Sequence, residues 1–154
     1  MDYTVFVTVI SGVLTYVAGQ LVLKLVIEPV QDTRRTIGQV SHSLIEHANV
    51  IANPGVPSAE VMKETAQHLR RLSSQLQSHL YLVPSYSVTA KVFSLPSKAK
   101  LLSASRNLIG LSNSVYRVTE KVYEQNASRV ESICDELSIY LPDDERMSKV
   151  LRDA

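Results

Sequence analysis

The pattern of hydrophobic and polar positions divides the chain into two parts. From Val5 to Ile27 nearly every position is apolar, whereas beyond Glu28 apolar residues recur at helical spacing among polar ones. As a helix, this run of about 23 residues would extend roughly 34 Å and cross a hydrocarbon core of about 30 Å. Lys24 lies near its end, where its long side chain can reach the membrane surface. The pattern therefore predicts a transmembrane anchor over residues 1–28 and a helical domain over residues 29–154.

Two other interpretations of the apolar run compete with a membrane span. A secretory signal would begin with basic residues, but the chain opens with Met1-Asp2-Tyr3 and has no convincing cleavage site after the run. A buried pair of strands would suit the many valines. However, no turn residues interrupt the run, and about 23 residues is far too long for one strand. We therefore favour the span.

Charged residues next to the run predict its orientation. No basic residue precedes it, whereas Lys24, Arg34 and Arg35 lie at its end or just after it. The positive-inside rule then places the N-terminus outside and the rest of the chain in the cytoplasm. Because proline disfavours helical geometry in the residue before it, Pro29 predicts a kink or break, with a new helix starting near Val30.

Two rows of residues in the span could contact other helices. The first consists of small residues spaced four, three and four apart, which would let a second helix approach closely: Thr8, Gly12, Thr15 and Gly19. The second is an intramembrane polar row: Tyr16, Gln20 and Lys24. Glycine and threonine are also common in spans without any partner. These rows predict self-association or a membrane partner.

Beyond the span, apolar stripes and proline-containing breaks predict an all-α bundle with helices at about 30–53, 58–83, 97–141 and 143–152. The first two are similar in length and are joined by a short loop. We therefore expect them to form an antiparallel hairpin.

If the first of these helices leaves the membrane, the second returns to it. The segment after it mixes aromatic and basic residues, which favour the bilayer surface. Five of them are predicted to contact that surface: Tyr86, Lys91, Phe93, Lys98 and Lys100. The alternative is an ordinary apolar loop packed on the bundle.

The predicted helix at 97–141 carries two rows with seven-residue spacing, which is typical of coiled-coil-like packing. One row is predicted to form the packing surface: Leu102, Ile109, Tyr116, Tyr123, Val130 and Leu137. The other row is Leu101, Leu108, Val115 and Val122. A helix of some forty residues would be about 60 Å long, well beyond the hairpin. It must therefore bend, for example near Gly110 or Asn126, or project toward another subunit.

The sequence offers little catalytic chemistry. A net charge of +1 gives no general attraction to nucleic acid, and a single cysteine excludes an internal disulfide. Five residues on the first two cytoplasmic helices could be considered as metal ligands: His42, Glu46, His47, Glu64 and His68. Their spacing matches neither H-E-x-x-H nor E-x-x-H, so solvated ion pairs on helix faces are favoured. We expect no catalytic, cofactor or metal site.

The junction LVLKLVIEPVQDTRRTIGQVSHSLIEHANVIANPG resembles that of small uncharacterised bacterial membrane proteins with one N-terminal span and a helical cytosolic part. The resemblance covers about the first third of the chain. It implies a single-pass topology in a bacterial inner membrane, and it implies no activity.

Together these patterns favour a membrane-anchored interaction or scaffold protein that acts by self-association or partner binding, without catalysis. One rival is a homo-oligomeric pore or membrane effector, in stress or phage defence, with the polar row lining water. The other rival is a metal-dependent hydrolase built on the histidines and glutamates named above.

Overall fold

The computed structural model describes residues 3–119, 121–142 and 146. Every regular element in these ranges is a helix, which confirms the all-α class. In chain order the elements are α1 (Tyr3–Val22), η1 (Leu23–Ile27), α2 (Glu28–Glu46), α3 (Ala48–Ala52), α4 (Ala59–Leu82), α5 (Tyr86–Val92), α6 (Lys98–Ser114) and α7 (Val122–Leu137).

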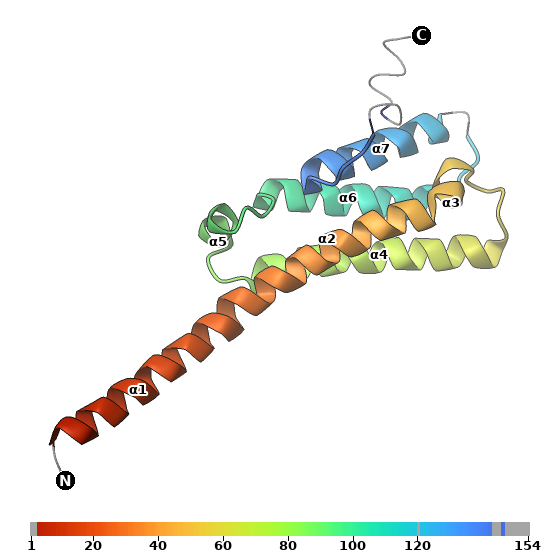
Figure 1. Cartoon of the computed structure of the whole chain (residues 1–154). Helices are drawn as coiled ribbons and strands as arrows, with labels where there is room; N and C mark the ends of the chain where they lie inside the picture. Colours follow the sequence, from red (N-terminus) through yellow and green to blue (C-terminus); the bar gives the residue numbers. More distant parts are fainter. Residues whose placement is uncertain (1–2, 120, 143–145, 147–154) are drawn as a thin grey trace.

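The first three elements form one helix that runs from Tyr3 to Glu46 (Figure 1). The break predicted at Pro29 is therefore wrong. Immediately before the proline the helix widens into the π-helical turn η1, where the Glu28 N–H donates to the Leu23 carbonyl five residues back. A proline ring inside an α-helix clashes with the carbonyl four residues before it, and the wider turn gives that carbonyl room. The helix therefore continues across the predicted domain boundary.

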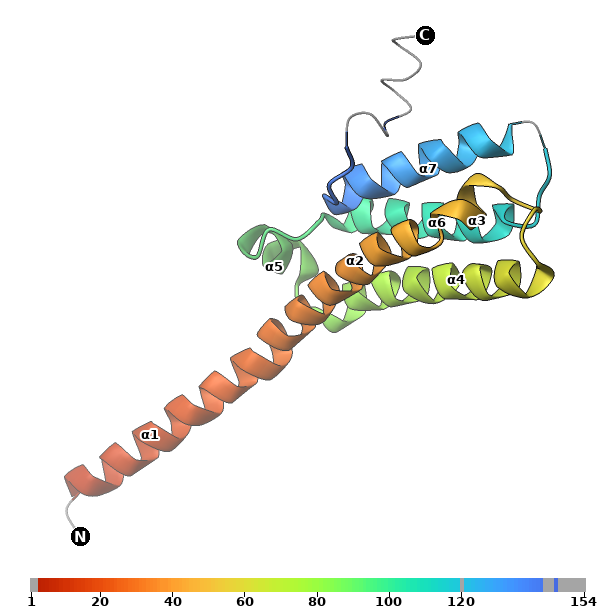
Figure 2. The ribbon, with the colours of Figure 1, turned by 45° about the vertical axis from the view of Figure 1, so that its right-hand side comes forward.

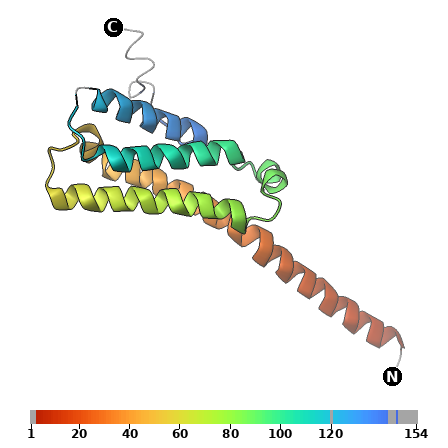
Figure 3. The same ribbon diagram turned by 180° about the vertical axis from the view of Figure 1, so that it is seen from behind.

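Beyond η1, α2, α4, α6 and α7 lie side by side, and each runs in the opposite direction to the one before it in this series (Figures 1 and 3). Their shared core is built from side chains that are at most 9% exposed. Its largest side chains that are at most 1% exposed come from all four helices: Val40, Leu69, Leu76, Leu101, Leu108, Leu111 and Ile133. Burial of these aliphatic side chains is the main source of stability for the bundle.

Small residues let α4 and α6 pack closely. The hydroxyl groups of Ser73 and Ser105 are 2.6 Å apart, and each also donates to the other residue's carbonyl, at 2.9 and 3.0 Å. Ala104, beside this pair on α6, is fully buried. These reciprocal bonds satisfy both buried hydroxyls, which would otherwise cost free energy.

Two of the helices differ in detail from the predicted ranges. In place of one helix at 30–53 there are α2 and α3, separated by a turn at His47. The helix predicted at 58–83 is α4, whose ends lie within one residue of that range. Its N-cap is Ser58, whose hydroxyl accepts a hydrogen bond from the Val61 N–H at 3.4 Å, as is common at helix starts.

The long helix predicted at 97–141 is wrong. The chain leaves the helix after Ser114, turns, and starts α7 at Val122, so that α7 packs back along α6 (Figure 3). Val115, Val118 and Thr119 lie in this turn, and β-branched residues disfavour helix. Folding back also buries the apolar face of α7, which a 60 Å helix would leave outside the bundle. The predicted packing row is thus divided between two helices.

Two ends of the bundle can be distinguished. The end next to α1 carries α5, and the opposite end carries α3, the 53–58 connection and residues 115–119 (Figures 1 and 2). The short helix predicted at 143–152 lies outside the described residues, apart from Arg146. The guanidinium of Arg146 pairs with Asp135 at 3.0 Å and with Glu131 at 3.7 Å on α7.

Candidate binding groove

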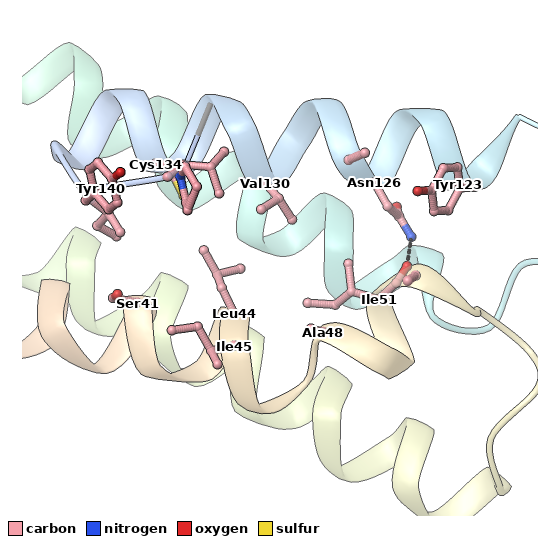
Figure 4. Close-up of a pocket in the computed structure, with 15 residues that line it drawn as sticks. Ser41, Leu44, Ile45, Ala48, Ile51, Tyr123, Asn126, Val130, Cys134 and Tyr140 are labelled. Atoms are coloured by element: carbon pink, nitrogen blue, oxygen red, sulfur yellow. Dashed lines mark hydrogen bonds between the residues drawn. The ribbon is translucent and has the colours of Figure 1, made fainter. Parts of the chain in front are cut away.

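An apolar groove lies between α2 and α7, where these two helices are splayed apart (Figure 4). One wall is formed by residues 41–52 of α2 and α3, including Leu44, Ile45 and Ala48. The other wall is formed by residues 123–134 of α7 and by the segment 139–142 that follows it. The volume of the groove, which is open to solvent on one side, is about 570 Å³. We call this feature the α2–α7 groove.

A hydrogen bond closes the groove at the end away from α1. The Asn126 side chain donates from Nδ2 to the Ile51 carbonyl at 2.9 Å, as the dashed line in Figure 4 shows. Asn126 is almost fully buried, and its Oδ1 accepts a bond from Arg129 at 3.4 Å. This amide therefore ties α7 to α3 and fixes the spacing of the two walls.

A reversal of the chain forms the other end of the groove. Ser138 has φ of +57°, and the Ile139 N–H bonds to the Cys134 carbonyl at 2.8 Å, which is typical of a helix that ends in a left-handed residue. The chain then turns back, and residues 139–142 line the groove. This left-handed conformation is modestly strained for serine, whereas glycine would adopt it without strain.

The groove suits an apolar ligand. None of its fifteen lining residues is charged, and the Asn126 amide is already occupied. Large apolar surface remains open to solvent, since Ile45 is 76% exposed and Tyr140 is 86% exposed. With few polar groups available to orient a small polar molecule, shape and apolar contact would determine what binds.

Sequence reasoning did not predict this groove. Its walls come from segments about 80 residues apart, and no local pattern joins them. One feature of the sequence could have indicated the second wall of the groove. Ile139 and Leu141 are apolar residues beyond the end of α7, and both pack against the core. Another such feature was Asn126, a polar residue among the apolar positions of α7.

The residues predicted to pack in the membrane lie on α1 and are all exposed. Hydroxyls of Thr8 and Thr15 bond to carbonyls four residues back, at 2.8 and 2.9 Å, so they are satisfied within the helix. A Cβ added to Gly12 or Gly19 would meet no atom within 4 Å. In the polar row, Lys24 pairs with Glu28 at 2.8 Å, while Tyr16 and Gln20 are exposed.

The five residues predicted to contact the membrane surface differ in exposure: one is buried, one is partly buried and three are exposed. Tyr86 is buried and its hydroxyl donates to the Pro96 carbonyl at 2.8 Å, so its assignment to the surface is wrong. Burial raises the pKa of Tyr86 to about 12. Phe93 packs partly against the core, and its carbonyl accepts a hydrogen bond from Arg34 at 2.8 Å. The three lysines of the set, Lys91, Lys98 and Lys100, are exposed.

The row predicted to form the packing surface of a long helix is mostly outside the core. Ile109, Tyr116 and Tyr123 are exposed, whereas Leu137 is buried. Leu102 and Val130 are half-buried. The parallel row is the inner one: Leu101, Leu108, Val115 and Val122 are all buried.

Histidines gather where α2 meets α3. The rings of His47 and His68 are 5.5 Å apart, edge to face, and His42 and His47 approach the Glu46 carboxylate at 3.6 and 3.8 Å. Burial, and then the neighbouring His47, lower the pKa of His68. Among the described residues, no three histidine, cysteine or acidic side chains are arranged to hold a metal ion. Glu64 is exposed on α4.

Comparisons of the chain with family models, with curated proteins and with solved structures found no match. The function must therefore be argued from the geometry described above.

Proposed function

We propose that this protein is a membrane-anchored interaction protein whose helical domain binds an apolar helix of a partner protein in the α2–α7 groove. The observation that carries the anchoring is that α1 is largely apolar around its whole circumference, while none of its side chains is buried. Exposure of that surface to water is unfavourable, whereas a bilayer would cover all of it and leave the helical backbone satisfied. No catalytic step is part of this proposal.

The dimensions of the groove support a helix as its ligand. The α7 wall covers residues 123–134 of one helix, which at 1.5 Å per residue is about 18 Å, or three helical turns. Helix-in-groove recognition places apolar side chains at positions such as i, i+4 and i+7 into a hydrophobic groove of this kind. The absence of charge from the lining residues also favours the apolar face of an amphipathic helix.

The basic residues after η1 support an orientation with the N-terminus outside and the bundle in the cytoplasm. That the membrane is a bacterial inner membrane is proposed from the resemblance of the junction alone. Arg34 and Arg35 lie in the part of α2 next to the proposed span, and Lys24 is neutralised by Glu28. This orientation predicts that Lys63, which is exposed on α4, reacts with an amine reagent only after the membrane is permeabilised.

Alkaline extraction of membranes tests the anchoring. We expect the full chain to remain in the membrane pellet and Leu14→Glu combined with Val17→Glu to release it, because both side chains are exposed on α1 and two charges would enter the hydrocarbon. The control, Val61→Glu, adds a charge at an exposed position of α4 and should remain in the pellet. Release of the unmodified chain would contradict the proposal.

Site-specific photocrosslinking in cells tests the groove. A photoreactive residue in place of Ile45 should give a discrete adduct, whereas one in place of Val61, which does not line the groove, should not. Ala48→Glu, an exposed change inside the groove, should remove the adduct by leaving a charge against an apolar ligand. Equal crosslinking from both positions, or an adduct unaffected by Ala48→Glu, would count against helix binding.

Self-association of α1 is a second candidate, because its small-residue face is open. With no atom within 4 Å of an added Cβ at Gly12 or Gly19, a second copy could approach the backbone closely. Gly12→Ile combined with Gly19→Ile should then abolish a dimer detected by crosslinking in nanodiscs. Val13→Leu combined with Val17→Leu is the control, because it leaves that face unchanged. A monomer in the unmodified protein would exclude this candidate.

A further inference from the structure

Apolar side chains are exposed on α5 and at the end of α4. Figure 2 shows that α5 lies at the end of the bundle next to α1. Val88 and Val92 are one helical turn apart on α5, so they share a face, and they are 64% and 71% exposed. Leu82 and Tyr81, at the end of α4, are 59% and 89% exposed. We call these four residues the α5 surface. Isolated apolar residues on a protein surface need no explanation, but a group of them at one end does.

Basic residues accompany the α5 surface. Lys91 lies between its two valines, and Lys98 and Lys100 start the next helix. In the part of the chain that the structure describes, none of the three lysines pairs with a carboxylate, whereas Glu28 and Asp32 are already paired with Lys24 and Arg35. This end of the molecule is therefore both apolar and positively charged, which is the combination that binds an anionic lipid surface.

The position of α5 along the proposed span is also suitable. The Arg34 guanidinium donates to the Phe93 carbonyl at 2.8 Å, which fixes the end of α5 beside the seventh residue after Ile27. Seven residues of helix extend about 10 Å. The headgroup layer on each side of a bilayer is roughly 5–8 Å thick, and membrane helices tilt by about 20° on average. Side chains that project from α5 toward α1 would thus reach the headgroups.

From these observations we propose that the α5 surface is a second membrane contact, in which Leu82, Val88 and Val92 enter the headgroup region of an anionic bilayer while the neighbouring lysines bind its phosphates. This proposal rests on the anchoring by α1 proposed above. It would hold the bundle in one orientation above the membrane and leave the α2–α7 groove accessible from the cytoplasm.

Single tryptophans can test this contact, because the chain contains none. Full-length Val92→Trp would be reconstituted into vesicles of phosphatidylcholine and phosphatidylglycerol whose acyl chains are brominated near the headgroup in one set and near the chain ends in another. Leu14→Trp, within α1, is the control for the span. Val56→Trp is the matched control, because Val56 is 80% exposed at the opposite end of the bundle and the substitution introduces the same lipid-seeking ring.

We expect tryptophan emission at positions 92 and 14 to be shifted to the blue and quenched by the brominated lipids, and emission at position 56 to remain like that of tryptophan in water. If position 92 behaves like position 56 while position 14 is quenched, the α5 contact is overturned and the anchoring stands. If position 14 is also unquenched, the anchoring itself fails. A blue shift at position 92 without quenching would mean that protein covers α5, and it would also overturn the proposal.

The charge requirement has its own test. Lys91→Gln, Lys98→Gln and Lys100→Gln, combined in the Val92→Trp protein, should weaken the contact by about fivefold per lysine on anionic vesicles. On vesicles of phosphatidylcholine alone, the same changes should have little effect. Equal quenching of both proteins on anionic vesicles would contradict a role for the lysines in lipid binding.

Discussion

At the scale of single residues, Leu108 and Ile109 show how sharply burial changes along α6. Leu108 is fully buried, whereas its neighbour Ile109 is 39% exposed. Leu108→Ala should lower the free energy of unfolding by about 2–5 kcal/mol, because the change removes buried methyl groups and leaves a cavity. Ile109→Ala, the matched control, should cost about 1 kcal/mol or less. Denaturant unfolding followed by circular dichroism would measure both, and equal losses would place Leu108 outside the core.

His79 predicts a dependence of stability on pH. Burial lowers its pKa below the usual 6.5, although the nearby Asp32 raises it in part, and Nε2 lies 2.8 Å from the Thr36 hydroxyl. The folded protein therefore favours the neutral imidazole. The free energy of unfolding should be highest above pH 6.5 and should fall as the pH drops below 6.5 and through the folded-state pKa, because the unfolded chain binds the proton more readily. Unfolding measured at a series of pH values tests this.

Two variants separate the contribution of His79 from that of His68, whose pKa is also lowered. His79→Gln keeps a polar group near Thr36 but cannot gain a proton, so the decrease in stability below pH 6.5 should become smaller. His68→Gln should remove a separate part of the decrease, and the double variant should show the weakest dependence. An unchanged pH profile for His79→Gln would show that His79 is not the titrating group.

At the scale of elements, the connection between α3 and α4 depends on Gly55. Its φ is +78°, its N–H donates to the Val115 carbonyl at 3.0 Å, and an added Cβ would collide with Val118. Gly55→Ala should therefore destabilise the protein by about 1–3 kcal/mol. Gly38→Ala should instead stabilise it by about 0.5–1 kcal/mol, since Gly38 is exposed in the middle of α2 with open space around it. Thermal unfolding distinguishes the two signs, and stabilisation by Gly55→Ala would falsify the account of this turn.

The helices themselves could largely be predicted from periodicity, but their connections could not. Seven-residue spacing identified Leu101, Leu108, Val115 and Val122 as one row, and all four are buried. However, the same spacing fits one long helix or two helices that fold against each other, because either arrangement places the row on one side. The choice depends on what α7 can pack against, and that information lies outside the segment. Pro29 was misjudged for a similar reason, since a π-helical turn accommodates it.

The candidate site could be predicted only in part. The apolar helix α1 could be predicted because a span, as proposed here, requires one continuous hydrophobic segment, which the sequence shows directly. The α2–α7 groove was not, because it exists only once Asn126 has bonded to Ile51, 75 residues earlier in the chain. For the membrane contact proposed at α5, composition indicated the segment and its three lysines, but not its exposed apolar residues: Tyr86 faces the core, and Val88 and Val92 are exposed.

At the scale of the whole molecule, one continuous helix joins an exposed apolar half to the half that packs in the bundle. Its first half is apolar and contributes no buried side chain, whereas α2 contributes Val30, Val40 and Leu44 to the core. The change occurs at η1, where Lys24 pairs with Glu28. Because the same helix continues through both parts, the position of the bundle relative to the proposed span is set by a rigid element. In that arrangement α5 lies close to the proposed bilayer, and the α3 end lies away from it (Figure 1).

This division predicts that the bundle folds without the anchor. A fragment of residues 27–154 keeps every side chain of the core, since the core begins at Val30. We expect the fragment to be soluble without detergent, to retain the helical circular dichroism of the remaining residues, and to unfold at the same denaturant concentration as the full chain in detergent. The physical reason is that removing α1 exposes no buried surface, so the free energy of unfolding loses no hydrophobic term. An insoluble or unfolded fragment would mean that α1 packs against the bundle, and the assignment of α1 to lipid would then have to be abandoned.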